Sequence, residues 1–167
     1  MKIEEYLKYI KNKLSGYFDI EERKKYGGTE YDLIAKSFIR SEKYIGSKKI
    51  TIYAMESTEH VFVKQYTEFD VRKLEKYVAT LVAATDSLVE VKADHMCTVI
   101  TGVIVLANQI DEAIKKRVNT YKHEKSFMFG LKGWTYIRLV VVQLEGGEVV
   151  TNKRGKEISR FYEVKIN

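Results

Sequence analysis

Two apolar stretches, HMCTVITGVIVLA (residues 95–107) and WTYIRLVVVQL (residues 134–144), decide the fold. Both are rich in Val, Ile and Thr, whose branched side chains favour strands over helices. Neither stretch alternates cleanly between apolar and polar residues, which indicates strands buried on both faces of a sheet. The residues expected at the centre of the core are Val99, Ile104, Ile137, Leu139 and Val141.

A helix is predicted between these two strands. Apolar residues recur at helical spacing from Ile110 to Tyr121, after Asn108, a residue type that caps helices. The order strand, helix, strand predicts parallel strands joined by a right-handed crossover. The Glu145–Glu148 turn, with its two glycines, predicts an antiparallel hairpin. Residues 157–166 alternate and predict a last strand.

The N-terminal half predicts two more helices and two or three strands. Apolar residues at helical spacing predict a helix over residues 3–14 and another that begins after Thr67. A short charged stretch over residues 21–25 separates the first helix from the strands. Residues 31–66 predict the strands, with turns at Gly46-Ser47 and Ser57-Thr58.

These elements predict a single α+β domain over residues 1–167. Its expected architecture is a mixed, twisted β-sheet of about six to seven strands packed by about three α-helices, with antiparallel hairpins flanking a parallel βαβ unit. The sequence contains no apolar run long enough for a membrane span, and its acidic N-terminus does not resemble a signal peptide. Because Cys97 is the only cysteine, we expect no intrachain disulfide and a cytoplasmic location.

Positive charge is concentrated in the C-terminal third. Residues 113–167 hold 12 basic and 5 acidic residues, a net charge of +7, whereas residues 1–112 hold 17 and 18, a net charge of −1. Aromatic residues, namely Phe127, Phe129, Trp134 and Tyr136, lie among these basic residues. Proteins that bind single-stranded nucleic acid combine basic and aromatic side chains in this way. The alternative is a solvated lysine-rich surface above an aromatic core.

We therefore predict a binding module, rather than an enzyme, whose partner is nucleic acid or another anionic ligand. The candidate residues are Lys115, Lys122, Arg138, Lys153, Arg154 and Lys156. Helical geometry places Lys115, Asn119 and Lys122 on one face, and the basic turn 152–156 could adjoin it across the sheet. Arg138 lies among apolar residues within a strand, so it needs either an acidic partner or a bound anion.

The alternative prediction is a metal-dependent enzyme. Its site would gather Glu56 and His60 with Asp94 or His95 at the strand ends, because these residue types bind divalent metals. Cys97 would then lie close to His95, although a buried cysteine more often behaves as a small apolar residue. The spacing matches no established zinc motif.

The opening element order, helix, three strands, helix and strand, is similar to that of the restriction-endonuclease-like fold over roughly the first 107 residues. The resemblance implies an acid on one strand and a Glu-x-Lys motif on the next, which together hold a divalent metal. Here Glu59 and Lys64 are five residues apart, and Glu90-Val91-Lys92 follows the second helix instead. No phosphate-binding loop or nucleophile motif is present, so no cofactor is predicted. A homodimer is left open.

Overall fold

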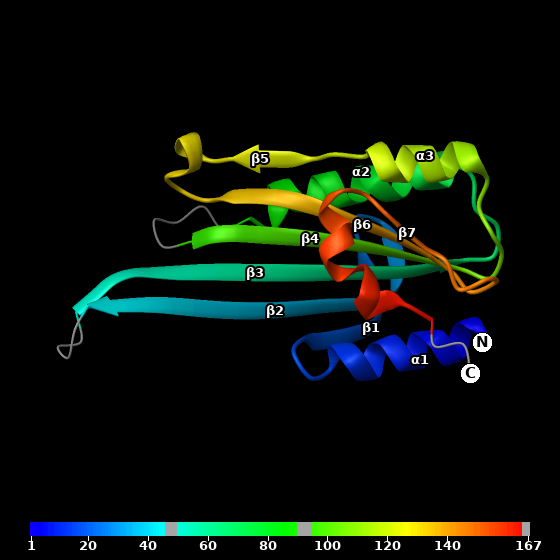
Figure 1. The fold of residues 1–167 in the computed structure, drawn as a ribbon, viewed down its shortest axis with the longest axis horizontal. Helices are drawn as coiled ribbons and strands as arrows, with labels where there is room; N and C mark the ends of the chain where they lie inside the picture. The colour runs from blue at the N-terminus through cyan, green and yellow to red at the C-terminus, as the bar shows by residue number, and fades with distance from the viewer. Residues whose placement is uncertain (46–49, 90–94, 165–167) are drawn as a thin grey trace.

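The computed structural model describes residues 1–45, 50–89 and 95–164; for residues 40–45, 50–56, 95 and 96 it describes the backbone alone. Within these residues lie three α-helices, seven strands and two 3₁₀ helices (Figure 1). Their bounds in chain order are α1 (Ile3–Leu14), β1 (Asp19–Tyr26), β2 (Thr29–Ile45), β3 (Ile50–Tyr66), α2 (Val71–Ser87), β4 (His95–Leu106), α3 (Glu112–Thr120), β5 (Glu124–Ser126), η1 (Met128–Gly130), β6 (Trp134–Gln143), β7 (Val149–Thr151) and η2 (Arg154–Tyr162). No helix among the described residues is long and apolar enough to cross a membrane.

All seven strands belong to one mixed sheet. Its order is β1-β2-β3-β4-β6-β5, and β7 also pairs with β6. Strands β3, β4 and β6 are parallel, whereas the β1–β2, β2–β3, β5–β6 and β6–β7 pairs are antiparallel. The α+β architecture, the parallel βαβ unit and the flanking hairpins predicted from the sequence are therefore confirmed.

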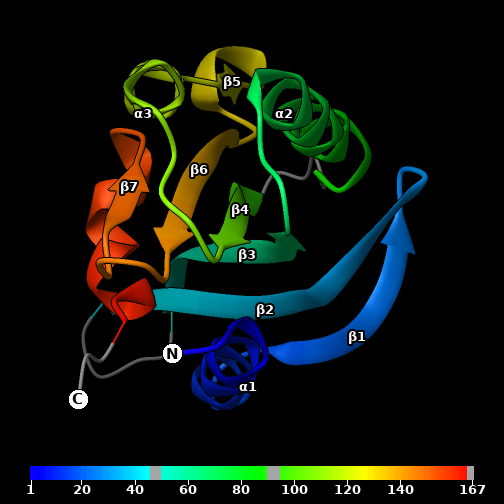
Figure 2. The same ribbon diagram turned by 90° about the vertical axis from the view of Figure 1, so that its right-hand side faces the viewer.

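Helices cover both faces of the sheet, but unequally. Figure 2 shows α2 and α3 on one side of the sheet and α1 on the other. The apolar cluster under α2 and α3 contains Ile100, Ile104, Ile137, Leu139 and Val141. The cluster under α1 and η2 contains Val61, Val103, Val105, Val140 and Val142. The five residues predicted at the centre of the core are all buried, with Val99 the most exposed at 7%.

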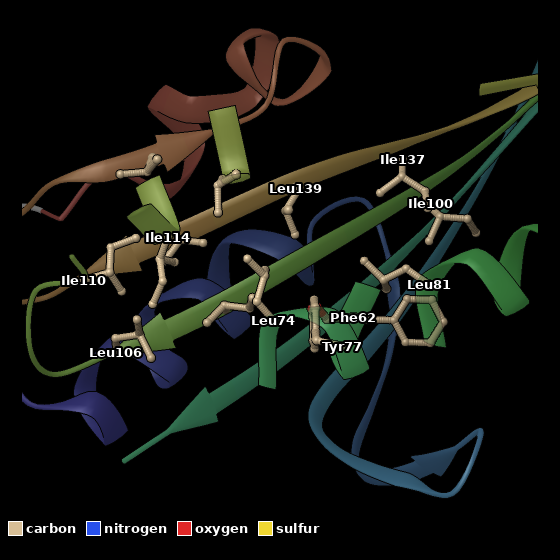
Figure 3. Packing of buried hydrophobic residues seen from close by; sticks show 14 of the residues in the cluster. Phe62, Leu74, Tyr77, Leu81, Ile100, Leu106, Ile110, Ile114, Ile137 and Leu139 are labelled. Carbon is tan, nitrogen blue, oxygen red and sulfur yellow. The ribbon is translucent and has the colours of Figure 1, made fainter. Parts of the chain in front are cut away.

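A glycine lets α2 pack closely against the sheet. A Cβ atom at Gly102 would lie 2.4 Å from Leu81 Cδ1 and 2.8 Å from Tyr77 Cε1, which is too close for carbon atoms. Figure 3 shows Tyr77, Leu81 and Phe62 together in this layer. The Tyr77 hydroxyl donates a hydrogen bond of 2.6 Å to the Phe62 carbonyl, so the buried polar atom is paired.

Several predicted boundaries are wrong. Asp70 rather than Thr67 caps α2, and Asp111 rather than Asn108 caps α3. A carboxylate is the better cap in both places because it accepts a charge-assisted hydrogen bond at the positive end of the helix dipole. The expected turn at Ser57-Thr58 lies inside β3, since both residues pair with β2 and β4. The expected turn at Gly46-Ser47 lies outside the described residues.

The charged stretch over residues 21–25 and the expected last strand are also corrected. Residues 21–25 belong to β1, which pairs with β2, and their side chains are charged because all five are exposed. Residues 157–162 form part of η2 instead of a strand. Ile158, Phe161 and Tyr162 recur three and four residues apart, which is a helical spacing, and all three pack with the cluster under α1.

Candidate functional site

The sheet face that carries α1 and η2 has an open half. Figure 1 shows η2 crossing in front of the sheet and α1 beside β1 and β2, both in the half of the sheet in which β4 and β6 end. Beyond them lies a cavity of about 410 Å³, which we call the open cavity. Its lining from β2, β3, β4, β6 and η2 includes Ser37, Ile39, Ser57, Glu59, Cys97, Val99, Trp134, Tyr136, Arg138 and Arg154. Side chains of four neighbouring strands are therefore accessible there.

Arg138 organises the floor of the open cavity. Its guanidinium donates hydrogen bonds to Glu59 Oε1 at 3.2 Å and to Glu157 Oε2 at 3.1 Å. Glu59 Oε1 also accepts a hydrogen bond of 2.6 Å from the Thr101 hydroxyl. The Arg138 side chain is only 12% exposed, so this pairing offsets much of the cost of its burial. Of the two roles predicted for Arg138, the structure shows the pairing with acids.

Arg154 connects the open cavity with a second, basic cavity. The second cavity has a volume of about 540 Å³ and is lined by Asn119, Thr120, Tyr121, Lys122, Glu124, Asn152, Lys153, Arg154 and Glu157. The Arg154 guanidinium carbon lies 4.6 Å from the centroid of the Tyr136 ring, within the range of a cation–π contact. Its Nε also donates a 2.7 Å hydrogen bond to Glu124. That hydrogen bond lowers the pKa of Glu124.

The buried Asn152 side chain positions the basic turn. Its Oδ1 accepts hydrogen bonds from the backbone N–H groups of Leu139 at 3.0 Å and Gly155 at 2.9 Å. Its Nδ2 donates to the carbonyls of Ile137 at 3.0 Å and Tyr121 at 3.3 Å. One amide thus joins β6, the end of α3 and the turn that carries Lys153 and Arg154.

An exposed apolar loop lies next to Trp134. The exposed fractions of Met128, Phe129 and Leu131 are 60%, 103% and 79%. Met128 and Phe129 have φ angles of 50° and 55°, a left-handed conformation that is unfavourable for side chains of this size. Trp134 itself is 37% exposed. Large apolar side chains held in solvent by a strained backbone indicate a binding surface.

The structure brings part of the predicted site together. Lys122, Lys153 and Arg154 line one cavity with Asn119, and Arg138 lies in the adjoining one. Lys156 is exposed on η2 and lines neither of these two cavities. Lys115 lies elsewhere on α3, where it forms ion pairs with Glu148 at 2.8 Å and Glu112 at 3.2 Å. Lys115 shares a helix face with Asn119, but its ion pairs join it to Glu148, between β6 and β7, and to Glu112 at the start of α3.

Sequence reasoning missed the residues that hold the site in place. Glu59, Thr101 and Glu157 support Arg138, and Asn152 supports the turn. Glu59 was considered only as a partner of Lys64, but Lys64 Nζ donates to the carbonyl of Glu30 instead. One signal in the sequence pointed to these residues. Arg138 lies among apolar residues within a strand, so a buried position for it requires an acidic partner from another part of the chain.

The metal prediction receives no support from the described residues. Among them, no three His, Cys, Asp or Glu side chains approach closely enough to hold a metal ion. His60 is buried at 7% exposure. Asp94 and the Glu90-Val91-Lys92 motif lie outside the described residues, and Glu56 and His95 are described by their backbone alone, as paired neighbours on β3 and β4.

Cys97 is a poor nucleophile in this structure. Burial raises the pKa of its thiol to about 11, although nearby Arg138 and Arg154 act in the opposite direction. The thiol is therefore protonated at neutral pH, whereas nucleophilic cysteines depend on the thiolate.

Comparison with known proteins assigns the chain to a protein family. No curated protein matches the chain. Residues 2–164 match a family model described as Domain of unknown function (DUF8052). Because the match covers nearly the whole sequence, including both cavities and the strands beneath them, the chain belongs to the DUF8052 family.

Proposed function

We propose that the chain is a binding module for single-stranded nucleic acid. The strand would lie across the open cavity and the basic cavity, with Arg154 between them. The observation that carries the proposal is the position of Arg154, which lines both cavities and lies over the Tyr136 ring.

Electrostatics support a ligand that carries several phosphates. Three basic side chains line the basic cavity: Lys122, Lys153 and Arg154. Of the two acids there, Glu124 pairs with Arg154 at 2.7 Å and with Lys122 at 3.6 Å, and Glu157 pairs with Arg138 at 3.1 Å. Lys153 forms no ion pair within the described part of the chain and is exposed to solvent. Individual phosphate contacts of this kind are weak and sensitive to salt, so affinity grows with the number of contacts.

Aromatic side chains support a single strand rather than a duplex. Trp134 and Tyr136 line the open cavity, and the exposed Phe129 lies in the loop that leads into Trp134. Bases stack on such side chains only when they are not already stacked within a duplex. An accessible sheet face with aromatic and basic residues is also a geometry that several RNA-binding modules use.

The first experiment measures fluorescence anisotropy of labelled single-stranded and double-stranded oligonucleotides at several salt concentrations. We expect stronger binding to single strands, and affinity that rises with length from about 4 to about 16 nucleotides. The K122A/K153A/R154A variant, which removes the three basic side chains of the basic cavity, should bind more weakly. Its slope of log affinity against log salt should be shallower by about 0.7 for each lost phosphate contact.

The matched control replaces three exposed lysines outside the site, Lys8, Lys25 and Lys76, with alanine. This variant changes the net charge by the same amount and should retain wild-type affinity within about twofold, because distant exposed charges are screened by salt. Equal weakening in both variants would show that binding depends on the overall charge of the chain and not on the proposed site. No binding of any oligonucleotide at low salt would reject the proposal.

The second experiment uses Trp134, the only tryptophan in the chain, as a reporter. Stacking of a base on the indole should quench its fluorescence as the oligonucleotide binds. Trp134→Ala should weaken single-strand binding by about 1–3 kcal/mol, the usual value for one base stacked on an aromatic ring. Anisotropy binding without any quenching would exclude the open cavity as part of the site.

A further inference from the structure

The outer edge of β2 is open along half of the strand. Strand β1 pairs with β2 only as far as Lys36, whereas β2 continues to Ile45 and stays paired with β3 to its end. We call Ser37–Ile45 the open stretch; Figure 1 shows it at the border of the sheet, with no described element beyond it. Backbone N–H and C=O groups along such an edge are free to pair with a further strand.

The open stretch lacks the usual protection of an edge strand. Edge strands are commonly charged, as β1 is over residues 21–25. In the open stretch, by contrast, Phe38 and Ile39 are 58% and 60% exposed. The far end of β2 pairs only with β3 within the described part of the chain, since the pairing of β3 with β4 begins at Glu56. A ribbon of two strands is marginally stable in water, so a further strand would stabilise it.

The sequence of the open stretch is complementary to itself in the antiparallel direction. Its nine residues read SFIRSEKYI (37–45), and Ser41 is the middle one. Outward-pointing backbone groups alternate along a strand, so two copies of one edge pair antiparallel only around an axis that passes through a residue position. With the axis at Ser41, Arg40 of each copy lies opposite Glu42 of the other. All nine residues of the open stretch then have a partner.

Neighbouring registers are less favourable. An axis at Arg40, Glu42 or Lys43 would place that charged residue opposite its own copy, and like charges directly opposite destabilise a strand pair. An axis at Ile39 would allow pairing over residues 37–41 alone, because β1 occupies the edge before them. Charge and length therefore favour the same register.

We propose that the chain forms a two-fold symmetric dimer in which the open stretch pairs antiparallel with that of a second copy, in register at Ser41. The sheet then continues from one copy into the other. Opposite residues of an antiparallel pair lie on the same face, and Ser37 and Ile39 line the open cavity, so both open cavities lie on one face of the joined sheet. One strand pair buries less surface than a standard interface, so we expect a dimer that dissociates on dilution.

The first test is sedimentation velocity without oligonucleotide, from about 1 to about 300 µM, where a weak interface dissociates. The average mass of the wild-type chain should rise with concentration from 19.4 kDa toward twice that value. Glu42→Arg and Arg40→Glu each place like charges opposite one another twice, and each should weaken self-association about tenfold. An equimolar mixture of the two variants restores both opposite-charge pairs and should dimerise within about threefold of the wild-type affinity.

Matched controls reverse a charge at exposed positions outside the open stretch. Lys76→Glu and Glu68→Arg should self-associate as the wild type does. Within one chain, Glu42 lies opposite Ala54 of β3, so Glu42→Arg disturbs no intrachain charge pair. Arg40 lies opposite Glu56, so the melting temperature of Arg40→Glu is measured before the mixture is made.

The second test measures the register directly, in a Cys97→Ala background that removes the only native thiol. Ser41→Cys places a thiol opposite its own copy, with Cα atoms about 4.5–5.5 Å apart, a distance that a disulfide spans. Ser37→Cys is the matched control, because the two copies of this position are eight residues out of register, about 26 Å apart. Mild oxidation should cross-link Ser41→Cys at least about tenfold faster than Ser37→Cys.

Three results would overturn the proposal. A wild-type chain that stays monomeric over the whole concentration range would exclude the dimer. Self-association that Glu42→Arg leaves intact, or that is not restored by mixing two variants with wild-type melting temperatures, would exclude the pairing of Arg40 with Glu42. Equal cross-linking of Ser41→Cys and Ser37→Cys would exclude the register. Neither test contains a nucleic acid, so both outcomes are separate from those of the proposed binding function.

Discussion

The two faces of β6 have different roles, although the residues that form them follow one another in alternation along a single strand. Ile137 and Leu139 face α2 and α3 and are completely buried. Tyr136 and Arg138 face the open cavity and take part in an ion-pair and cation–π network. A single strand thus supplies the core on one side and a candidate site on the other, because side chains alternate between the faces of a sheet. What decides the role of each side chain is whether a helix covers it.

The same contrast exists along one face. Val103 and Val140 lie under α1 and η2, whereas Val99 and Tyr136 on the same strands line the open cavity. The covered half contains aliphatic residues, whereas the open half contains aromatic, polar and charged residues beside Val99 and Ile39. The following substitutions test whether coverage by helices sets how much each side chain contributes to the free energy of unfolding.

The largest effect is expected on the covered face. Leu139→Ala should lower the free energy of unfolding by about 2–5 kcal/mol, because it removes a large side chain that is fully buried. Urea denaturation followed by circular dichroism measures this change. A loss of less than about 1 kcal/mol would show that the layer under α2 and α3 is loosely packed.

A pair of valine substitutions compares the covered and open halves directly. Val103→Thr buries a hydroxyl under α1 and should cost about 1–3 kcal/mol. Val99→Thr places the hydroxyl at the open cavity, where water can reach it, and should cost less than about 1 kcal/mol. Equal losses in the same denaturation experiment would contradict the difference in coverage.

The next effect concerns the ion pair in the open half. A double-mutant cycle with Arg138→Gln and Glu59→Gln should give a coupling energy of about 1 kcal/mol, since both side chains are partly shielded from water. The exposed pair of Lys11 and Glu22 is the control and should give no more than about 0.5 kcal/mol. A smaller coupling energy for the Arg138–Glu59 pair than for the control pair would show that this ion pair does not stabilise the fold.

The smallest effect concerns pH. Burial, with a smaller contribution from Lys125, lowers the pKa of His123, so the folded state favours the neutral ring. The resulting stability is fully present above the ordinary histidine pKa of about 6.5, and it is lost as the pH falls from there through the lowered folded-state pKa. The melting temperature of the wild-type chain should therefore fall more between pH 7.5 and pH 5.5 than that of His123→Gln. An identical fall in melting temperature for both proteins would show that His123 does not contribute to the pH dependence of stability.

Local patterns in the sequence were sufficient to predict the core. The apolar runs over β4 and β6 and the helical spacing between them predicted parallel strands, a crossover helix and the buried positions. This works because burial of long apolar segments is strongly favoured and because spacing of two or about 3.6 residues allows only a few packing arrangements. The helix starts were predicted less well, since Thr67, Asp70, Asn108 and Asp111 are all acceptable caps.

The candidate site was only partly predictable. Charge counts pointed to the C-terminal third, and Lys122, Lys153 and Arg154 do line one cavity. Nothing local to the sequence indicated that Lys115 would pair with Glu148, or that Asn152 would be buried as a four-bond connector. Such pairs join residues that are distant in the chain, so they depend on how the elements are packed.

The sequence by itself predicted the central strands β4 and β6, the three α-helices and the excess of positive charge, but it did not predict β1 or the helical form of η2. Only the tertiary structure decided that η2 and α1 stop short of the N-terminal half of β4 and β6, which leaves the open cavity. It also decided that α2 and α3 lie apart over Leu139 and leave a groove. The physical reason is that an apolar pattern specifies which side chains avoid water, whereas the length and angle of the packed helices specify which of them are covered.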